Sequence, residues 1–177
     1  MKGTIITCLR EIVIGAGGDD VWQACLSGAG FETYTVFTLG EEVPDHKAVR
    51  LIQVICEKLG LTLEQAGDAF GEHWVTSYAP RLYQHLYGRY PTARDFFTNI
   101  NEMHDRVTKH ITDAKPPRFR LEWTSPIALV MHYESHRGLI DVAVGMARAM
   151  GRLYKESLVV TKLSPKALRI VFPAPAQ

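Results

Sequence analysis

One histidine on an amphipathic helix is the first side chain in this sequence with a type and position suited to chemistry. Apolar residues recur there at helical spacing: Phe97, Ile100, Val107 and Ile111. His104 falls on the same stripe, four residues after Ile100. A lone histidine on such a stripe is more often a packed core residue than a metal ligand. No second His, Cys or carboxylate shares that face three or four positions away, so a zinc site with several protein ligands is poorly supported.

A cofactor that brings most of its own metal ligands needs only one histidine. Haem is such a cofactor, because its ring supplies four nitrogens and one neutral imidazole completes the proximal side. Haem also carries two carboxylates, and Tyr133, Ser135 and Arg137 stand at every second position. On an extended segment they would project from one face over roughly 13 Å, with an arginine fork suited to carboxylates. Taken alone, this triplet is better explained as a solvated strand end.

The elements that must position these residues begin with helices. Apolar spacing, capping residues and glycines predict six helices over the first part of the chain: 5–13, 19–28, 44–59, 62–78, 80–87 and 92–110. The first is expected to end at Gly15, Gly17 and Gly18, and the third at Gly60. The fourth opens with the capping pair Thr62 and Gln65, and the last carries His104.

The period of the hydrophobic pattern changes after Pro116 and Pro117. Residues 118–125 alternate, with Phe119, Leu121 and Trp123 on one face, and 127–135 form a second strand-like run. A helix over 138–154 and two further strands around Ser164-Pro165 complete the pattern. This order predicts an α+β fold with an antiparallel sheet rather than a parallel α/β fold.

The segment Tyr133-Glu134-Ser135-His136-Arg137 matches the YxSxR motif of the haem-nitric oxide/oxygen binding (H-NOX) family, which includes the sensor domain of soluble guanylate cyclases. His104 lies 29 residues before Tyr133, where that family places its axial iron ligand. The sequence resembles the family over nearly the whole chain, including the MKG start and FGEHWV at 70–75. The resemblance implies one domain over 1–177, with an N-terminal helical lobe (1–60), a haem-binding lobe with a four-stranded antiparallel sheet (61–177), and haem b between them.

The resemblance also implies roles on the haem side of the site. His104 would be the axial iron ligand, and Tyr133, Ser135 and Arg137 would hold the propionates. Pro117 looks like the family's proline that presses on the porphyrin and keeps it non-planar.

The gas side of the site departs from the oxygen-binding members of the family. Those members use a tyrosine hydroxyl, and the matching position, five after Arg137, is Val142. Valine cannot donate to a polar iron–oxygen unit in an apolar pocket. The resemblance therefore implies a sensor of nitric oxide, with carbon monoxide also possible, that discriminates against oxygen. An apolar wall would follow, although each member is equally well explained as core: Ile5, Leu9, Val142 and Met146.

Two aromatic residues complicate this selectivity argument. Trp74 and Tyr78 are four residues apart and share a helix face, in a helix that borders the gas pocket in the family. Packing in the core is the simpler interpretation of both. If either polar group reached the gas, the argument from Val142 would weaken.

Composition limits the classes of partner. With 20 Lys+Arg against 19 Asp+Glu, the net charge of +1 gives no basic excess for nucleic acid or an anionic membrane. The N-terminal segment is too short and too charged to span a membrane. Cys8, Cys25 and Cys56 form no CxxC pair, which favours buried thiols in a reducing cytoplasm.

By resemblance, nitric oxide weakens the bond between iron and His104, haem relaxes against Pro117, and the histidine helix shifts relative to the N-terminal lobe. We find no output enzyme signature in the sequence, so we expect the signal to pass to a histidine kinase or a cyclic-di-nucleotide enzyme in trans. Two alternatives remain open. One is a small enzyme using His104 as a general base with an anionic substrate, although no nucleophile elbow or phosphate loop supports it. The other is a haem carrier.

Overall fold

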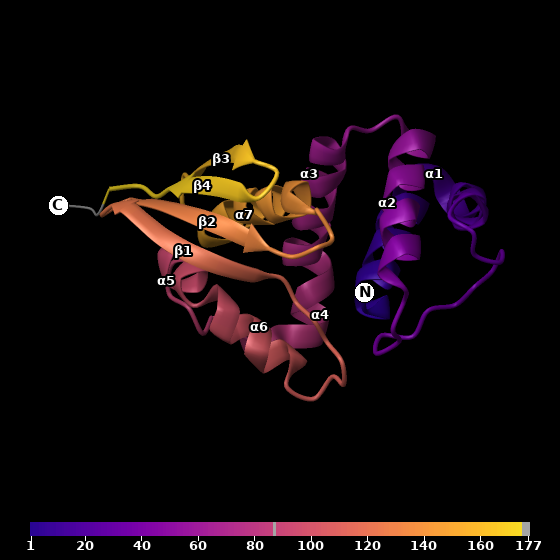
Figure 1. Ribbon diagram of the computed structural model, residues 1–177, viewed down its shortest axis with the longest axis horizontal. Helices are drawn as coiled ribbons and strands as arrows, with labels where there is room; N and C mark the ends of the chain where they lie inside the picture. Colours follow the sequence, from indigo (N-terminus) through magenta and orange to yellow (C-terminus); the bar gives the residue numbers. More distant parts are fainter. Residues whose placement is uncertain (87, 175–177) are drawn as a thin grey trace.

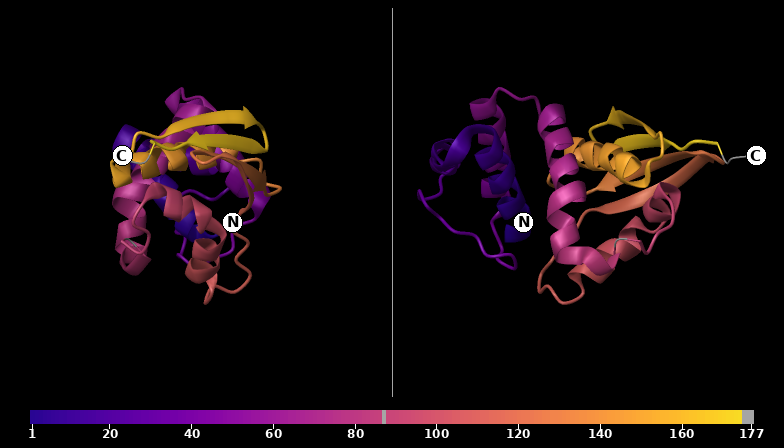
Figure 2. Two further views of the ribbon diagram at one scale, coloured as in Figure 1. Left: turned by 90° about the vertical axis from the view of Figure 1, so that its left-hand side faces the viewer. Right: turned by 180° about the vertical axis from the view of Figure 1, so that it is seen from behind.

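The molecule has a helical end and a sheet end, with one helix standing between them. The computed structural model describes residues 1–86 and 88–174. Helices α1 (Gly3–Gly28) and α2 (Asp45–Leu59) form the first end, and α3 (Leu63–His73) separates them from the sheet (Figure 1). Figure 2 shows the same order from behind. The predicted α+β class is confirmed.

The N-terminal helix continues further than its glycines predict. The expected stop at glycines 15 to 18 is wrong, because the chain stays helical through Gly17 and only kinks at Gly18 (φ 82°, ψ 176°). A glycine adopts this backbone conformation without the steric cost that a side chain would add. The kink separates the two predicted helices without a loop. Helix α2 ends as predicted at Gly60, which is left-handed (φ 66°).

Helix α3 begins with the predicted capping box. The Gln65 N–H donates to Thr62 Oγ1 (3.2 Å), and the Thr62 N–H donates to Gln65 Oε1 (2.8 Å). The helix changes at Trp74 into a π-helical turn, η1 (Trp74–Tyr78), and then into α4 (Ala79–Tyr83) and the 3₁₀ turn η2 (Gln84–Leu86). The helical piece expected over 80–87 is therefore short, and Tyr87 lies outside the described residues.

Glycines let α3 and α7 (Ile140–Tyr154) pack with their backbones in contact. A Cβ atom at Gly67 would lie 2.3 Å from the Asp141 carbonyl oxygen, and one at Gly145 would lie 2.0 Å from the Gly67 carbonyl oxygen. No side chain fits at either position without moving a helix. These glycines therefore fix the distance between α3 and α7.

The predicted helix over 92–110 is two helices, and the prediction of one continuous helix is wrong. Helix α5 (Ala93–Thr98) opens with the expected Thr92 cap, and α6 (Ile100–Thr108) follows after a break at Asn99 (φ −106°, ψ 17°). The Asn99 side chain donates to the Asp95 carbonyl (2.8 Å), so it competes with the helical backbone pattern. The break gives α6 a direction of its own.

The sheet has the strand order β1-β2-β4-β3 and is antiparallel throughout. Its strands are β1 (Arg118–Ser125), β2 (Ala128–Glu134), β3 (Val159–Ser164) and β4 (Ala167–Val171). Strand β2 ends before Ser135, and Arg137 lies in a turn. The expectation that Tyr133, Ser135 and Arg137 share one extended segment is therefore wrong, because only Tyr133 is in the strand.

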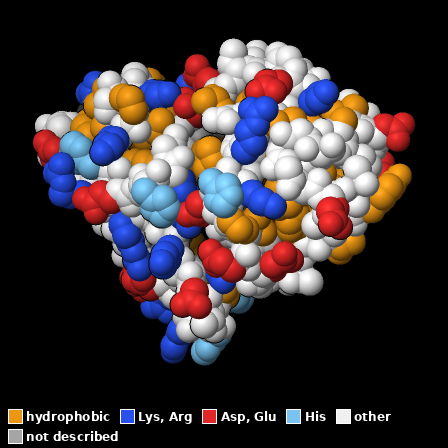
Figure 3. Space-filling model, turned by 45° about the vertical axis from the view of Figure 1, so that its right-hand side comes forward, with side chains coloured by type: hydrophobic (Ala, Val, Ile, Leu, Met, Phe, Trp, Pro, Cys, Tyr) orange, Lys and Arg blue, Asp and Glu red, His pale blue; other side chains and the backbone are white. Residues whose placement is uncertain are grey.

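Two hydrophobic clusters form the core. The first joins α1 and α2 around Trp22, Leu26 and Leu51, and the second joins the sheet and α7 around Leu129 and Ile170. The three cysteines are buried and unpaired, as predicted. No helix in residues 1–86 or 88–174 combines the length and apolar character that crossing a membrane requires. Figure 3 shows acidic and basic side chains interspersed on one face, without a continuous basic patch there.

Candidate functional site

A cavity of about 610 Å³ lies between the two hydrophobic clusters. It takes walls from both ends of the molecule and from α3 between them, and its size is in the range of ~300–1,000 Å³ typical of small-molecule sites. Nine of the eleven predicted site residues line it: Ile5, Leu9, Trp74, His104, Pro117, Tyr133, Arg137, Val142 and Met146. Tyr78 and Ser135 do not.

The His104 wall, formed by His104, Pro117 and Phe119, belongs to the sheet end of the molecule. Helix α6 presents His104, whose ring lies 6.2 Å from the ring of Phe119 on β1. Asn101, one turn earlier on α6, donates to the Phe119 carbonyl (2.7 Å) and accepts from the Phe119 N–H (3.0 Å). Sequence reasoning missed Asn101, and its position three residues before His104 is the only signal that pointed to it. These two hydrogen bonds fix α6 to β1, the strand that follows Pro117.

The imidazole of His104 is in the form that a metal ligand needs. Burial lowers the pKa of His104 to about 4, and the Pro117 backbone opposes that effect only in part. The ring is therefore neutral at physiological pH. Its Nδ1 atom is buried and makes no hydrogen bond of ordinary length and angle. A neutral imidazole keeps one nitrogen lone pair free, and His104 lines the cavity, so the ring suits a metal that the cavity would hold.

The apolar wall, formed by Ile5, Leu9, Val142 and Met146, packs against the first cluster. Ile5 and Leu9 come from α1, and Val142 and Met146 come from α7, whose backbone packs closely against α3. None of the four side chains can donate a hydrogen bond. The cavity therefore has one wall with a histidine and another with no polar side chain.

The two aromatics of η1 behave differently. The Tyr78 hydroxyl is hydrogen-bonded to Thr7 Oγ1. Thr7 lies within 3.0–3.1 Å of the Gly3 and Thr4 carbonyls, to which its hydroxyl donates, so Tyr78 donates to Thr7. Trp74 does line the cavity, stacked on Tyr78 at 5.5 Å between ring centres. Its indole N–H makes no hydrogen bond in the described residues.

The mouth of the cavity is charged, and Arg137 is its most constrained group. Arg137 Nε donates to Asp45 Oδ1 (2.9 Å), and Nη1 donates to the Lys115 carbonyl (2.7 Å). Ser135 Oγ accepts weakly from the Arg137 N–H (3.4 Å), outside the cavity. Tyr133 is buried, and its hydroxyl has no hydrogen bond within the described chain. Arg137 and Tyr133 are thus brought together at the cavity, and Ser135 is not.

Asp45 ties the helical end of the molecule to this mouth. It accepts from the Met1 amine (2.7 Å), from Arg137, and from His136 Nε2 (2.6 Å). Burial alone would raise the pKa of Asp45, but the hydrogen bonds from Arg137, the amine and His136 outweigh it and hold the pKa well below its usual range. Sequence reasoning missed this residue, because an aspartate in the first turn of a helix is already explained by the helix dipole.

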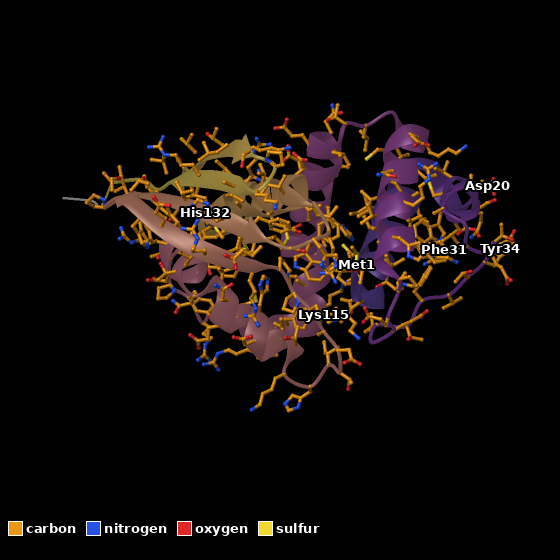
Figure 4. All side chains as sticks on the ribbon, in the orientation of Figure 1. Met1, Asp20, Phe31, Tyr34, Lys115 and His132 are labelled. Atoms are coloured by element: carbon orange, nitrogen blue, oxygen red, sulfur yellow. The ribbon has the colours of Figure 1, made fainter. Side chains whose placement is uncertain are left out.

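Further lining residues carry polar groups that the pattern did not identify. Tyr83 and Tyr90 line the cavity, and the Tyr90 hydroxyl is buried without a partner. Lys2 and Lys115 line it at the charged end. The only sequence signal that could have identified Lys115 as a lining residue is its position two residues before Pro117. Figure 4 places Met1 and Lys115 near the middle of the molecule, between its two ends.

These features fit haem. No group of three or more His, Cys, Asp or Glu side chains in the described parts of the chain is arranged to hold a metal ion, so an iron here must bring other ligands with it. A porphyrin does so, and its apolar faces match the lining while its carboxylates match the cationic mouth. His104 supplies one neutral imidazole with an unsatisfied nitrogen.

The fold and this site define an α+β domain with a cavity suited to haem, and comparison with known proteins gives its family. A family model described as haem-NO-binding matches residues 2–162, so the chain belongs to that family. Soluble guanylate cyclase gcy-35 of Caenorhabditis elegans is 24% identical over 171 residues, covering 94% of this chain and 25% of the cyclase. Gcy-37 of the same organism is 26% identical, covering 86% and 22%. The chain spans about a quarter of the length of these relatives.

Solved H-NOX structures share the fold. An Fe(II) unliganded mutant H-NOX protein from K. algicida has a TM-score of 0.86 at 20% identity, covering 99% of this chain and 98% of that one. An oxygen-binding H-NOX domain has a TM-score of 0.79 at 24% identity, covering 99% and 96%. The S. oneidensis protein in its Fe(II)NO state has a TM-score of 0.85 at 15% identity, covering 98% of each. Because oxygen-binding and NO-bound proteins share this fold, the choice of gas has to be argued from residues.

Membership settles the broad class. The family comprises haem-based gas-sensor domains related to soluble guanylate cyclase, and these domains are not catalytic. The alternative of a small enzyme with His104 as its general base is therefore set aside. Cyclase activity in the relatives belongs to other domains.

Proposed function

We propose that this chain is a nitric oxide sensor in which His104 binds the iron of haem b. When bound, haem supplies a ferrous iron that takes up diatomic gases such as nitric oxide and carbon monoxide. The observation that carries the proposal is one cavity with a half-buried, neutral His104 on one wall and the apolar side chains of Ile5, Leu9, Val142 and Met146 on another. The first wall suits an iron ligand, and the second suits a gas that needs no hydrogen bond.

The selectivity against oxygen rests on two side chains. Val142 occupies the wall position where a tyrosine hydroxyl would donate to oxygen, and it has no donor. Tyr78, whose helix borders the gas pocket in the family, lies outside the cavity lining and donates to Thr7 instead. A polar ligand that receives no hydrogen bond in an apolar cavity loses the stabilisation that such a bond gives, and we assign the Trp74 and Tyr83 donors of the lining to packing. Nitric oxide needs no such bond, so it is favoured.

The propionates are assigned to the charged mouth. Tyr133 and Arg137 face the cavity there, and Tyr133 has a hydroxyl without another partner. Ser135 stands outside the lining, and we assign it to holding the Arg137 backbone, from which its Oγ accepts a bond of 3.4 Å. Pro117 is placed beside His104 on the same wall, where it would press on one face of the ring.

The signal would travel through the elements that join the two ends. Asn101 makes α6 and β1 move as one unit, and Asp45 ties the mouth to α2. A change in the bond held by His104 would therefore shift the sheet end against the helical end, as a two-state element. We propose a histidine kinase or a cyclic-di-nucleotide enzyme in the cytoplasm as the recipient. The unpaired buried cysteines suit a reducing compartment.

Spectroscopy of the reconstituted protein tests this function. We expect one haem per chain, and we expect anaerobic nitric oxide to bind the ferrous protein and abolish the iron–histidine stretching band. A protein that takes up no haem would contradict the sensor and the carrier alike. Binding of nitric oxide with the band unchanged would leave only a carrier.

Trp74 and Tyr83 provide the internal check on selectivity. Both line the cavity and carry a donor with no hydrogen bond in the described chain. If the ferrous protein held oxygen, Trp74→Phe or Tyr83→Phe would abolish that binding and identify the donor. We expect neither variant to alter behaviour in air, because we assign both side chains to packing.

A further inference from the structure

We propose that Lys115 is the counter-charge for one haem propionate, a role that the YxSxR residues leave unfilled. The inference rests on the proposed haem site. It follows from three observations at the mouth: how Arg137 is used, how the Lys115 backbone is held, and what the Lys115 ammonium lacks.

Arg137 is already engaged by groups of the protein. Its Nε donates to Asp45 (2.9 Å) and its Nη1 donates to the Lys115 carbonyl (2.7 Å). Three of its five N–H groups, one on Nη1 and two on Nη2, are left for a ligand, and Asp45 offsets the guanidinium charge only in part because it also accepts from the Met1 amine and from His136. An arginine held in this way can orient one carboxylate but cannot neutralise two.

The segment carrying Lys115 is held at the mouth from two sides. Arg137 binds its carbonyl, and Lys2 Nζ donates to the Thr112 carbonyl (2.7 Å) three residues earlier. Lys2 itself pairs with Glu42 (2.8 Å), a carboxylate that the Met1 amine also contacts (3.2 Å). These bonds fix the Lys115 backbone beside the cavity, next to Pro116 and Pro117.

The ammonium group of Lys115 is unpaired. Within residues 1–86 and 88–174 it makes no ion pair or hydrogen bond, and Lys115 is an exposed residue at the edge of the cavity lining. A lysine in an ordinary solvated position needs no partner, but this one stands at the edge where Tyr133 and Arg137 already mark the carboxylate end of the ring. A second carboxylate at that edge would meet a flexible cation within reach.

The test compares Lys115→Met with Lys109→Met, which removes an exposed lysine of the same connection that does not line the cavity. The measurement is the rate of haem transfer from the full chain to excess apomyoglobin at low salt. Each protein is loaded with haem or with haem dimethyl ester, which has no free carboxylates. Lys115→Arg is the conservative variant, and thermal unfolding of each apoprotein checks the fold.

We expect Lys115→Met to lose haem about two- to fivefold faster than wild type, the range for an exposed ion pair. Lys109→Met and Lys115→Arg should match wild type, and high salt should shrink the difference. With the ester, wild type and Lys115→Met should lose the cofactor at equal rates. Equal rates with free-acid haem, or the same acceleration with the ester, would overturn the inference while leaving the haem site intact. A wild-type chain that takes up no haem would overturn the site as well.

Discussion

The two walls of the cavity differ in how the chain builds them. The His104 wall depends on one polar side chain, His104, whose pKa is lowered by burial, and on two hydrogen bonds between Asn101 and the Phe119 backbone that join α6 to β1. The apolar wall depends on shape, because the backbone contact of α3 and α7 presents Val142 and Met146 without any polar bond. We therefore expect the His104 wall to determine the affinity for haem and the apolar wall to determine which gas binds. Single substitutions should separate these properties.

Removing the imidazole should have the largest effect. We expect His104→Gly to weaken haem binding by at least roughly 100-fold, because the loss of even a supporting residue around a metal ligand costs ~10–100-fold. Added imidazole should restore binding and should not restore signalling. Haem titration of the apoprotein measures this. His110→Gly, an exposed histidine on the same segment, is the control and should bind normally. Unchanged haem affinity in His104→Gly would show that His104 does not bind the iron.

Adding a hydrogen-bond donor to the apolar wall should remove the selectivity against oxygen. We expect Val142→Tyr to raise oxygen affinity by roughly 10–100-fold, since a hydrogen bond to a charged acceptor is worth ~1.5–3 kcal/mol. Oxygen titration of the ferrous protein measures it. Val142→Phe adds the ring without the hydroxyl and should not raise the affinity. Equal gains in both variants would show that bulk, not hydrogen bonding, governs the wall.

Cutting the tie between the two ends should lower stability. We expect Asp45→Asn to reduce the unfolding free energy of the apoprotein by about 1–2 kcal/mol. Because the folded-state pKa of Asp45 lies below its unfolded value, near ~3.9, the stabilisation is complete above that pH and is lost as pH falls through the folded pKa. Urea unfolding at several pH values measures it. Asp20→Asn serves as control, and a difference that grew on acidification would contradict the assignment.

Removing the cap of α3 should have the smallest effect on the walls. Thr62→Ala should cost about 1 kcal/mol of unfolding free energy, because the Gln65 N–H loses the Thr62 hydroxyl as its acceptor. Thr62→Ser keeps the cap and should be close to wild type. Haem affinity and gas choice should stay unchanged in both. A shift in gas affinity would show that the start of α3 controls the apolar wall.

Local signals in the sequence were sufficient for some of this fold. The cap at Thr62, the end at Gly60 and the alternation in β1 each depend on neighbours along the chain, so they could be predicted. The break at Asn99 could not, because a side-chain bond to Asp95 competes with an otherwise regular helical stripe. The turn after Glu134 could not be predicted either, because the alternation of Tyr133, Ser135 and Arg137 continues past the end of β2.

The site divides in the same way. His104, Pro117 and Val142 could be placed from motif spacing, and the structure brings them to one cavity. Asp45 and Lys115 could not, because their roles depend on contacts between residues far apart in the chain. Tyr78 is a residue that the resemblance assigned to the site and that the structure does not place in the cavity lining. Its hydroxyl is hydrogen-bonded to Thr7, a residue 71 positions away in the chain.

The absorbance spectrum of the ferrous, haem-loaded protein in air tests the central claim most directly. If the apolar wall selects against oxygen, the spectrum in air stays that of the unliganded ferrous protein until it oxidises, and nitric oxide then changes the spectrum of a freshly reduced sample at one equivalent. A stable oxygen-bound spectrum in air would contradict the account.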